Sequence, residues 1–332
     1  MKTSVLAVEI GGSKLQLAWV DHGGAVRRVY RGQVAPGSGA QEILSWFRAS
    51  APRFLEELAQ VEGLRIGQIG IGFGGPVDSA RGLVLTSHQI AGWDRYPLCA
   101  WFEEQFGIPA LLENDSNCAG YAEYCCGAGR GTRQFCYMNI GSGIGGALVA
   151  DGKLYTGQGL GAAEIGHTWV PDWTAGQAGV AVKLEDRCSG WSIERRIRQW
   201  KSLNAGTPLY TACGGDASQL TCAQLGEAAA AGDGRALSEL DRVANALAVA
   251  LGNVITLFHP ERIALGGGVA LMGEVLVGPL RKKLERYAFG EYRGSFEVVP
   301  CELEESVVTV GAGLIAARAL EGRGESDSGA VS

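Results

Sequence analysis

The chain has 332 residues, of which 46% are hydrophobic and 19% are charged, and this composition excludes a largely disordered protein. One hydrophobic core rarely serves a chain of this length, so two domains are expected. The net charge of −6, with no basic stripe to neutralise phosphates, argues against a nucleic-acid partner.

Nine cysteines occur without a CxxC pair, and no secretory segment precedes them. An odd number of cysteines in this context is typical of reduced thiols in a cytoplasmic protein. Residues 1–4 lead directly into a strand pattern, so no targeting peptide is expected. No apolar run approaches the ~18 residues that span a bilayer, and no membrane partner is expected.

The first third of the chain has the element order of an α/β domain rather than of an all-β sandwich. Strands are predicted over 5–10, 15–20, 25–30 and 66–73, with a helix over 40–60 before the last of them. Short glycine-containing turns separate the first three strands, and Gly74-Gly75-Pro76 ends the fourth.

A polar cluster, Glu113-Asn114-Asp115-Ser116-Asn117, follows a short apolar strand over 109–112. Cys118, Tyr121, Ala122 and Cys125 then recur at the spacing of one helix face, so Asp115 lies at a strand-to-helix junction. Such a junction can hold a carboxylate at the edge of a cleft, where it could act as the general base of a phosphoryl transfer. The alternative is that Asp115 only caps the helix, which is the commoner role when this stretch is considered alone.

The pattern of the N-terminus returns 130 residues later, because Glu9-Ile10-Gly11 matches Asn139-Ile140-Gly141 and Asp21 matches Asp151. A strand over 135–140, a turn and a strand over 144–150 repeat the first hairpin. This internal repeat predicts two similar domains that face each other across a cleft.

The remainder of the chain is mainly helical. An apolar stripe from Leu240 to Phe258 predicts a buried core helix, which His259-Pro260 ends. A strand over 262–265 and a final helix over about 310–320 follow. The Gly/Ser/Asp-rich tail, residues 322–332, is expected to be disordered.

Three glycine turns each follow an apolar strand: Gly11-Gly12-Ser13-Lys14, Gly141-Ser142-Gly143 and Gly266-Gly267-Gly268. Glycine allows several backbone N–H groups to converge on an anion, and the serines and the lysine add donors. Two of the turns occupy matching repeat positions, which indicates a nucleotide held between two lobes. A Walker loop is excluded because GxxxxGK[ST] does not occur.

The motifs EIGGSK, GFGGPVD, GW followed by ENDSN, GSGIGG, GAAEIGH, LED and IALGGG occur in this order. Together they resemble the ROK family of bacterial sugar kinases and sugar-responsive repressors, from about Val5 to Leu320. The resemblance implies an α/β, actin-like ATPase (ribonuclease H-like) fold with two lobes and an active-site cleft. The first lobe would comprise residues 1–115 and the C-terminal helix of about 310–321, and the second residues 116–309.

The resemblance makes Asp115 the catalytic base, because a sugar hydroxyl is a poor nucleophile and needs a carboxylate to accept its proton. It implies sugar binding by Gly75, Asn114, Glu164, His167 and Glu185. It implies ATP binding by Gly11, Gly12, Ser13, Lys14, Gly141, Ser142, Gly143, Gly267 and Gly268. Magnesium is expected to accompany ATP, with assistance from Glu9.

The family usually holds zinc with the histidine of the GH motif and three cysteines, but those cysteine positions here are Gly176, Ala178 and Lys183. Cys188 and one histidine cannot complete a tetrahedral site, so no zinc is predicted. Packing by Trp169 and Trp173 is expected to shape residues 169–184 instead.

Further departures concern the pocket. Gln89, with His88 beside it, stands where an asparagine usually precedes the GW pair, and it is included among the sugar-binding positions. Glu9 replaces an aspartate and Ser13 a threonine, which preserves a carboxylate and a hydroxyl.

These observations predict a cytoplasmic ATP-dependent hexose kinase, foremost a glucokinase, and family analogy suggests a homodimer. Allose, mannose, fructose and N-acetylmannosamine remain alternative sugars. A sugar-sensing regulator is a second hypothesis. The position of the first predicted strand, close to residue 1, and the presence of Asp115 argue against it. An actin-like ATPase that drives a conformational change in a partner is a third, and the sugar-type residues argue against it.

Overall fold

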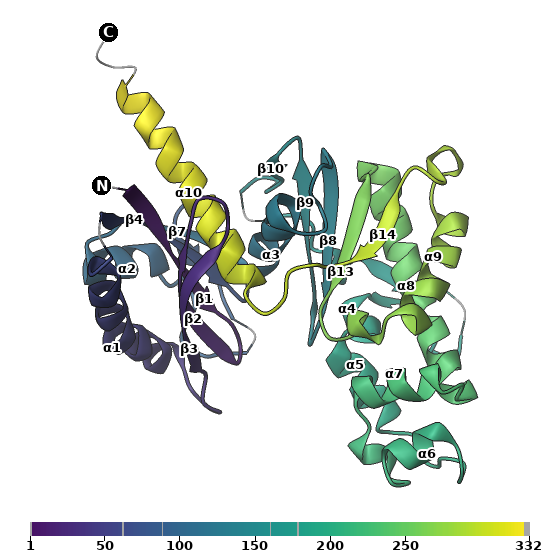
Figure 1. Ribbon diagram of the computed structural model, residues 1–332. Helices are drawn as coiled ribbons and strands as arrows, with labels where there is room; N and C mark the ends of the chain where they lie inside the picture. The colour runs from purple at the N-terminus through teal and green to yellow at the C-terminus, as the bar shows by residue number, and fades with distance from the viewer. Residues whose placement is uncertain (1, 62, 88, 160, 178, 329–332) are drawn as a thin grey trace. The chain divides into compact units, whose positions relative to one another are not determined.

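The computed structural model describes residues 2–61, 63–87, 89–159, 161–177 and 179–328, so His88 and Ala178 lie outside the described residues. It divides into two compact units (Figure 1). The first contains Met1–Gly131, Ala147–Ala162 and Glu302–Ser332, and the second contains Thr132–Gly146 and Ala163–Cys301.

The first unit is built on a five-stranded sheet of order β3-β2-β1-β4-β7. Its strands are β1 (Lys2–Ile10), β2 (Lys14–Val20), β3 (Val26–Gln33), β4 (Leu64–Phe73) and β7 (Ala110–Asn114). β1, β2 and β3 are antiparallel neighbours, whereas β1, β4 and β7 run parallel. The predicted strands are confirmed, and β7 reaches two residues beyond its predicted end.

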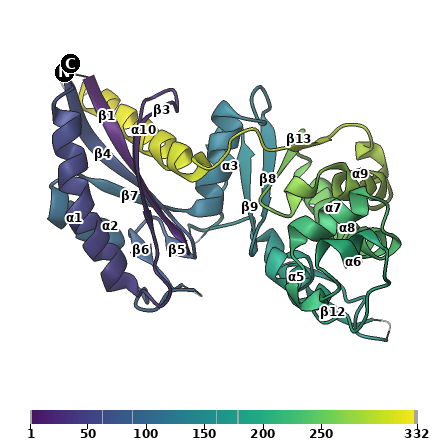
Figure 2. The same cartoon turned by 60° about the horizontal axis from the view of Figure 1, so that its bottom comes forward.

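Helices cover both faces of this sheet (Figure 2). On one face Leu6, Val8 and Ile10 pack with the apolar stripes of α1 (Ala40–Ala59) and α2 (Leu98–Phe106). On the other face Val5 and Ala7 pack with α3 (Asp115–Cys126) and α10 (Val307–Ser328). The alternation along β1 follows from the two-residue period of a strand. Two short strands, β5 (Val77–Asp78) and β6 (Leu83–Val84), form a separate pair.

The packing of α3 against α10 moves the domain boundary from its expected place after residue 115 to Gly131. At this contact Gly311 has no space for a side chain, because a Cβ there would overlap the carbonyl group of Cys118. Residues 116–131 therefore remain with the first unit.

The second sheet has the order β10-β9-β8-β13-β14, which matches the order of the first strand for strand. Its strands are β8 (Gln134–Ile140), β9 (Ile144–Ala150), β10 (Lys153–Leu154), β13 (Arg262–Gly266) and β14 (Glu297–Pro300). β8 and β14 both run parallel to β13. The predicted internal repeat is thus confirmed in the strand topology.

A hairpin, helices and 3₁₀ turns make up the rest of the second unit, whereas β10 and the end of β9 are assigned to the first unit with Ala147–Ala162. A two-stranded hairpin joins β11 (Trp169–Pro171) to β12 (Ala181–Lys183). The helices are α4 (Glu185–Cys188), α5 (Gly190–Ile197), α6 (Pro208–Ala212), α7 (Cys222–Ala230), α8 (Gly234–Phe258) and α9 (Glu274–Tyr287). The 3₁₀ turns are η1 (Ile165–His167), η2 (Ala217–Gln219), η3 (Ala270–Met272) and η4 (Gly290–Tyr292).

The helix α8 is the predicted core helix. Among the described residues it is the one helix that is long and apolar enough to cross a membrane by length and composition. The sequence prediction considered only continuous apolar runs and did not find it. However, 61% of its most apolar window is buried within the protein, as in a core helix. Asp233 caps its first turn, and His259 ends it in a left-handed conformation.

The C-terminal helix is longer than predicted. α10 runs to Ser328, so the expected disorder is wrong for residues 322–328, while residues 329–332 lie outside the described part of the chain.

Candidate active site

Three parallel strands of the first unit end in the same row of the sheet. Ile10 of β1 pairs with Phe73 of β4, and Phe73 pairs with Asn114 of β7. The segments that follow these residues, including Gly74 and Asp115, therefore meet at one edge. The carboxyl edge of parallel strands is where α/β proteins bind their ligands.

Asp115 is the first residue of α3 and is partly exposed at this edge. Its Oδ1 accepts hydrogen bonds from the Ser116 backbone N–H at 2.7 Å and from the Ser116 hydroxyl at 3.3 Å. Its Oδ2 lies 3.4 Å from the position that a Cβ on Gly74 would occupy. The glycine therefore leaves space directly beside the carboxylate.

The cap of α3 is Asn114, not Asp115. The Asn114 Oδ1 accepts the backbone N–H groups of Ser116 at 2.9 Å and Asn117 at 3.2 Å. The alternative interpretation of Asp115 as the helix cap is thus wrong. Asn114 also donates from Nδ2 to the carbonyl of Gly75 at 3.1 Å, which ties the loop after β4 to the start of α3.

The buried carboxylate of Glu113 stabilises the junction between β7 and α3. The Glu113 Oε1 accepts the backbone N–H of Asn114 and the Nδ2 of Asn117, both at 2.9 Å. Glu113 and Asn117 are 8% and 2% exposed, so the polypeptide around Asp115 is held by interior hydrogen bonds.

Glu9, at the end of β1, is almost completely buried beside the first glycine turn. The Lys14 ammonium lies 3.1 Å from its Oε1, and Gln16 donates to its Oε2 at 3.0 Å. Burial raises the pKa of Glu9 from 4.5 to about 7; Lys14 opposes this effect, whereas Asp115 and Glu305 add to it.

The Lys14 ammonium also donates to the Glu305 carbonyl at 2.8 Å. The Lys14 ammonium therefore contacts both the Glu9 carboxylate and the Glu305 carbonyl. Gln16 and Glu305 were missed from the sequence, since no local pattern relates a residue of β2 to one 289 positions later.

The first glycine turn is closed by a hydrogen bond from the Gly11 N–H to the Lys14 carbonyl at 2.9 Å. Gly12 and Ser13 are exposed at its tip. The amide of Gln89 lies against Gly12 so closely that a Cβ there would overlap it. The structure thus places Gln89, a predicted sugar-binding residue, beside the first glycine turn.

The second unit brings two further glycine turns together. The Gly141 N–H donates to the Gly143 carbonyl at 2.9 Å, and the exposed Ser142 lies between them. Gly267, after β13, has φ +85°, and a Cβ there would come within 2.5 Å of the Ile140 carbonyl. Only glycine allows this approach, which sets the two turns side by side. Gly268 is exposed and has open space around it.

Glu185 begins α4 and contacts the first of these turns. Its Oε2 accepts the Ile144 backbone N–H at 2.7 Å and would lie 2.6 Å from a Cβ on Gly143. His167 ends η1, and the Leu184 N–H donates to the Thr168 carbonyl at 2.9 Å. His167 and Glu185 therefore lie at the open end of the β11–β12 hairpin.

Glu164 and His167 are both exposed on a segment that packs against β9. A Cβ on Gly166 would overlap the Ile144 carbonyl, and one on Gly146 would lie 2.6 Å from the Ala163 carbonyl. Two glycines thus let the segment lie directly on the strand. The sugar roles of Glu164, His167 and Glu185 remain predictions.

A zinc site does not fit the residues that are present. Gly176 and Lys183 offer neither thiolate nor imidazole, and Ala178 lies outside the described residues. Within the described ranges no group of three or more His, Cys, Asp or Glu side chains could hold a metal ion.

Glu123 is a functional candidate that the sequence did not reveal. Its side chain is completely buried on α3 and accepts backbone N–H groups from Ala128, Glu302 and Leu303 at 2.8, 3.1 and 2.7 Å. It thus binds the turn that follows α3 and one remote segment, at Glu302 and Leu303, to the helix that begins with Asp115.

Known proteins share both the sequence and the fold. The ROK family model matches residues 5–319. A glucokinase of Thermotoga maritima is 32% identical over 317 residues, which cover 95% of this chain and 97% of that protein. A ROK family glucokinase of Streptomyces griseus, solved in complex with glucose and AMPPNP, is 29% identical, with a TM-score of 0.75 and coverage of 95% and 99%.

A ROK hexokinase of Thermus thermophilus is 26% identical, with a TM-score of 0.77, over 96% of this chain and 99% of that chain. The duplicated sheet is that of the actin-like ATPase fold, as expected from the resemblance. With its family model matched from residue 5 to residue 319, the chain belongs to the ROK family.

Proposed function

We propose that this protein is an ATP-dependent glucokinase that converts glucose and ATP to glucose 6-phosphate and ADP. Phosphoryl transfer to a sugar is the reaction class of its kinase relatives, and the protein is a sugar phosphotransferase. The observation that supports the catalytic proposal most directly is the placement of Asp115 at the edge of three parallel strands.

Asp115 acts as the general base in this proposal. Its Oδ1 is oriented by the N–H and hydroxyl of Ser116, while its Oδ2 lies beside the space that Gly74 leaves. The carboxylate accepts the proton of the sugar 6-hydroxyl as that oxygen attacks the γ-phosphorus. General-base catalysis of this kind contributes roughly 10²–10⁴-fold to the rate.

The sugar is recognised by groups that are expected to donate to and accept from its hydroxyls. Asn114, Glu164, His167 and Glu185 supply amide, carboxylate and imidazole groups, and Gly75 and Gln89 are the other sugar-binding positions in the proposal. A site of this kind discriminates strongly against an analogue that lacks a hydroxyl, because the polar groups of the protein are then left unpaired.

The glycine turns bind the phosphates of ATP through backbone N–H groups in the proposal, and Ser13 and Ser142 add hydroxyl donors. Magnesium, when bound, neutralises charge on the transferring phosphoryl group. The carboxylate of Glu9 is an oxygen donor of the kind that this ion prefers, and one or two such carboxylates suffice when phosphates supply further ligands.

A coupled ADP-release assay over a panel of hexoses tests the proposal. Glucose is expected to give the highest kcat/KM, with allose, mannose, fructose and N-acetylmannosamine as comparators. Preference for another hexose would overturn glucose as the substrate. Absence of turnover with every hexose, with ATP or polyphosphate as donor, would overturn the kinase proposal and favour a sugar-binding regulator.

The role of Asp115 has a separate test. Asp115→Asn is expected to lower kcat at least 100-fold without changing ATP affinity or thermal stability. Asp241→Asn, on an exposed face of α8, is the matched control and is expected to behave as the wild type. If Asp115→Asn retains more than about a tenth of the wild-type kcat, the loss of rate is smaller than the loss of a general base would cause, and Asp115 is not the base.

We also propose a cytoplasmic homodimer, which rests on family analogy alone. Light scattering coupled to size-exclusion chromatography is expected to give twice the chain mass, and a monomeric mass would contradict it.

A further inference from the structure

Side-chain contacts hold the segment between β11 and β12 to the rest of the second unit. Asp172 directly follows β11, and its backbone N–H donates to the Val180 carbonyl at 2.9 Å, which closes a loop of residues 172–180. The Asp172 side chain is only 7% exposed, although the loop lies at the surface. A buried carboxylate of this kind requires strong partners.

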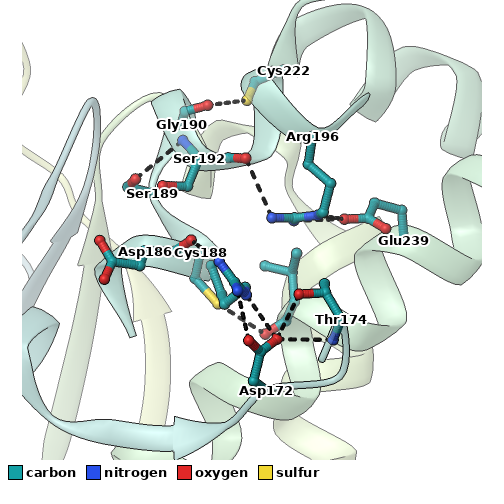
Figure 3. Close-up of polar contacts among 12 residues, drawn as sticks. Asp172, Thr174, Asp186, Cys188, Ser189, Gly190, Ser192, Arg196, Cys222 and Glu239 are labelled. Carbon is teal, nitrogen blue, oxygen red and sulfur yellow. Dashed lines mark hydrogen bonds and ion pairs between the residues drawn. The ribbon is translucent and has the colours of Figure 1, made fainter. Parts of the chain in front are cut away.

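Arg187 of α4 supplies the main partner. Its Nε donates to the Asp172 Oδ1 at 2.9 Å and its second terminal nitrogen to Oδ2 at 2.6 Å, which is a bidentate pair. Thr174 adds its backbone N–H at 2.8 Å and its hydroxyl at 2.7 Å, both to Oδ1 (Figure 3). These hydrogen bonds hold the pKa of Asp172 well below its usual range, and Asp172 raises the pKa of Arg187.

A second arginine, Arg196, contacts Trp173, the next residue of the loop. The Arg196 guanidinium lies 5.4 Å from the centre of the Trp173 ring and forms an ion pair with Glu239 of α8 at 2.6 Å (Figure 3). Packing by Trp173 is thus as expected, whereas Trp169 is 64% exposed and does not shape the segment.

The connection of this loop to the predicted sugar residues is short. Glu185 begins α4 two residues before Arg187, and His167 lies two residues before β11. The hairpin joins His167 to Asp172, and α4 joins Arg187 to Glu185. The Asp172–Arg187 pair therefore closes the polypeptide between these two residues into a ring that contains Glu185. His167 lies just outside this ring, and the hydrogen bond from the Leu184 N–H to the Thr168 carbonyl ties its neighbour to it.

We propose that the Asp172–Arg187 ion pair is a metal-free cross-link that positions His167 and Glu185 for the sugar. The ion pair fixes the loop, as a structural metal would if positions 176 and 183 held metal-binding residues in place of Gly176 and Lys183. Asp172 and Arg187 are positioning residues and do not contact the substrate. The inference rests on the proposed function, because it assigns a sugar role to the residues that are positioned.

The test compares Asp172→Asn with Asp241→Asn, which makes the same substitution in the exposed Asp241–Lys283 pair of the same unit. Asp172→Asn is expected to raise KM for glucose about 10-fold or more, with a smaller change in kcat, because a small displacement of binding groups is costly. Asp241→Asn is expected to leave both constants unchanged.

Further variants separate positioning from general damage to the fold. Arg187→Lys keeps the charge but not the two-pronged geometry, and it is expected to raise KM less than Asp172→Asn does. The double variant Asp172→Arg with Arg187→Asp is expected to recover part of the lost glucose affinity. The KM for glucose of this double variant is compared with that of Asp172→Arg alone and of Arg187→Asp alone. A KM no lower than that of either single variant would overturn the ion pair as the positioning element.

Hydrogen exchange supplies a readout that needs no activity. Asp172→Asn is expected to speed exchange of the amides in 168–184 while other amides of the second unit keep their rates. Faster exchange there with unchanged KM would overturn the positioning role. Unchanged exchange, or stoichiometric zinc in metal analysis of the purified protein, would overturn the cross-link. Wild-type inactivity towards every hexose would refute the proposed function alone, since the exchange experiment would still decide on the cross-link.

Discussion

Removal of the Glu123 carboxylate tests how the start of the candidate site is supported. The side chain is completely buried and accepts three backbone N–H groups, one from Ala128 on Oε2, one from Glu302 on Oε2 and one from Leu303 on Oε1. Each hydrogen bond to a charged group contributes about 1.5–3 kcal/mol, and an unpaired buried N–H costs a similar amount.

Two substitutions divide this contribution. Glu123→Ala removes the carboxylate from all three N–H groups, of which only the one of Ala128 is in a fully buried hydrogen bond, so a loss of about 3 kcal/mol or more in the free energy of unfolding is expected. Glu123→Gln keeps one acceptor oxygen and places an amide NH₂ where the other was, so a loss of about 1.5–3 kcal/mol is expected. The predicted order is therefore wild type, then Gln, then Ala.

Equilibrium unfolding in urea, followed by tryptophan fluorescence and circular dichroism, measures these changes. Glu302→Ala is the matched control, because it removes only an exposed ion pair with Arg130 and leaves the Glu302 backbone N–H in place. It should cost no more than about 1 kcal/mol. A loss below about 1 kcal/mol for Glu123→Ala, or equal losses for Ala and Gln, would refute the reasoning.

Two further predictions concern pH and packing. Because the pKa of Glu9 is raised from 4.5 to about 7, the folded state holds a proton that the unfolded state releases between these values. The associated stability, about 3 kcal/mol, is complete below pH 4.5 and lost as pH rises through 7. Without nucleotide or magnesium, the melting temperature of Glu9→Gln is thus expected to exceed that of the wild type by more at pH 8 than at pH 5. An equal difference in melting temperature at the two pH values would contradict the argument. Gly70→Ala is expected to cost about 1–3 kcal/mol in urea unfolding, because a Cβ would overlap the Ala312 carbonyl of α10. Gly234→Ala, which meets open space, should cost nothing, and equal losses for the two would argue against steric overlap.

The sequence alone determined the local architecture and the family. Alternating apolar residues set the strands, because successive side chains of a strand point to opposite faces. Glycine turns at matching positions predicted the repeat, which both sheets confirm. The ordered motifs identified the ROK family, and the junction at Asp115 was visible because an apolar strand and a helical period meet there.

The tertiary structure decided what depends on contacts between remote residues. In the structure, Asn114 caps α3, the first segment of the first unit ends at Gly131, and Asp172 forms an ion pair with Arg187. The structure also brought Glu123 to the backbone at Glu302, 179 positions away. Hydrogen bonds of this kind depend on how helices pack on sheets, and a single polar side chain leaves no period in the sequence that could predict its partner.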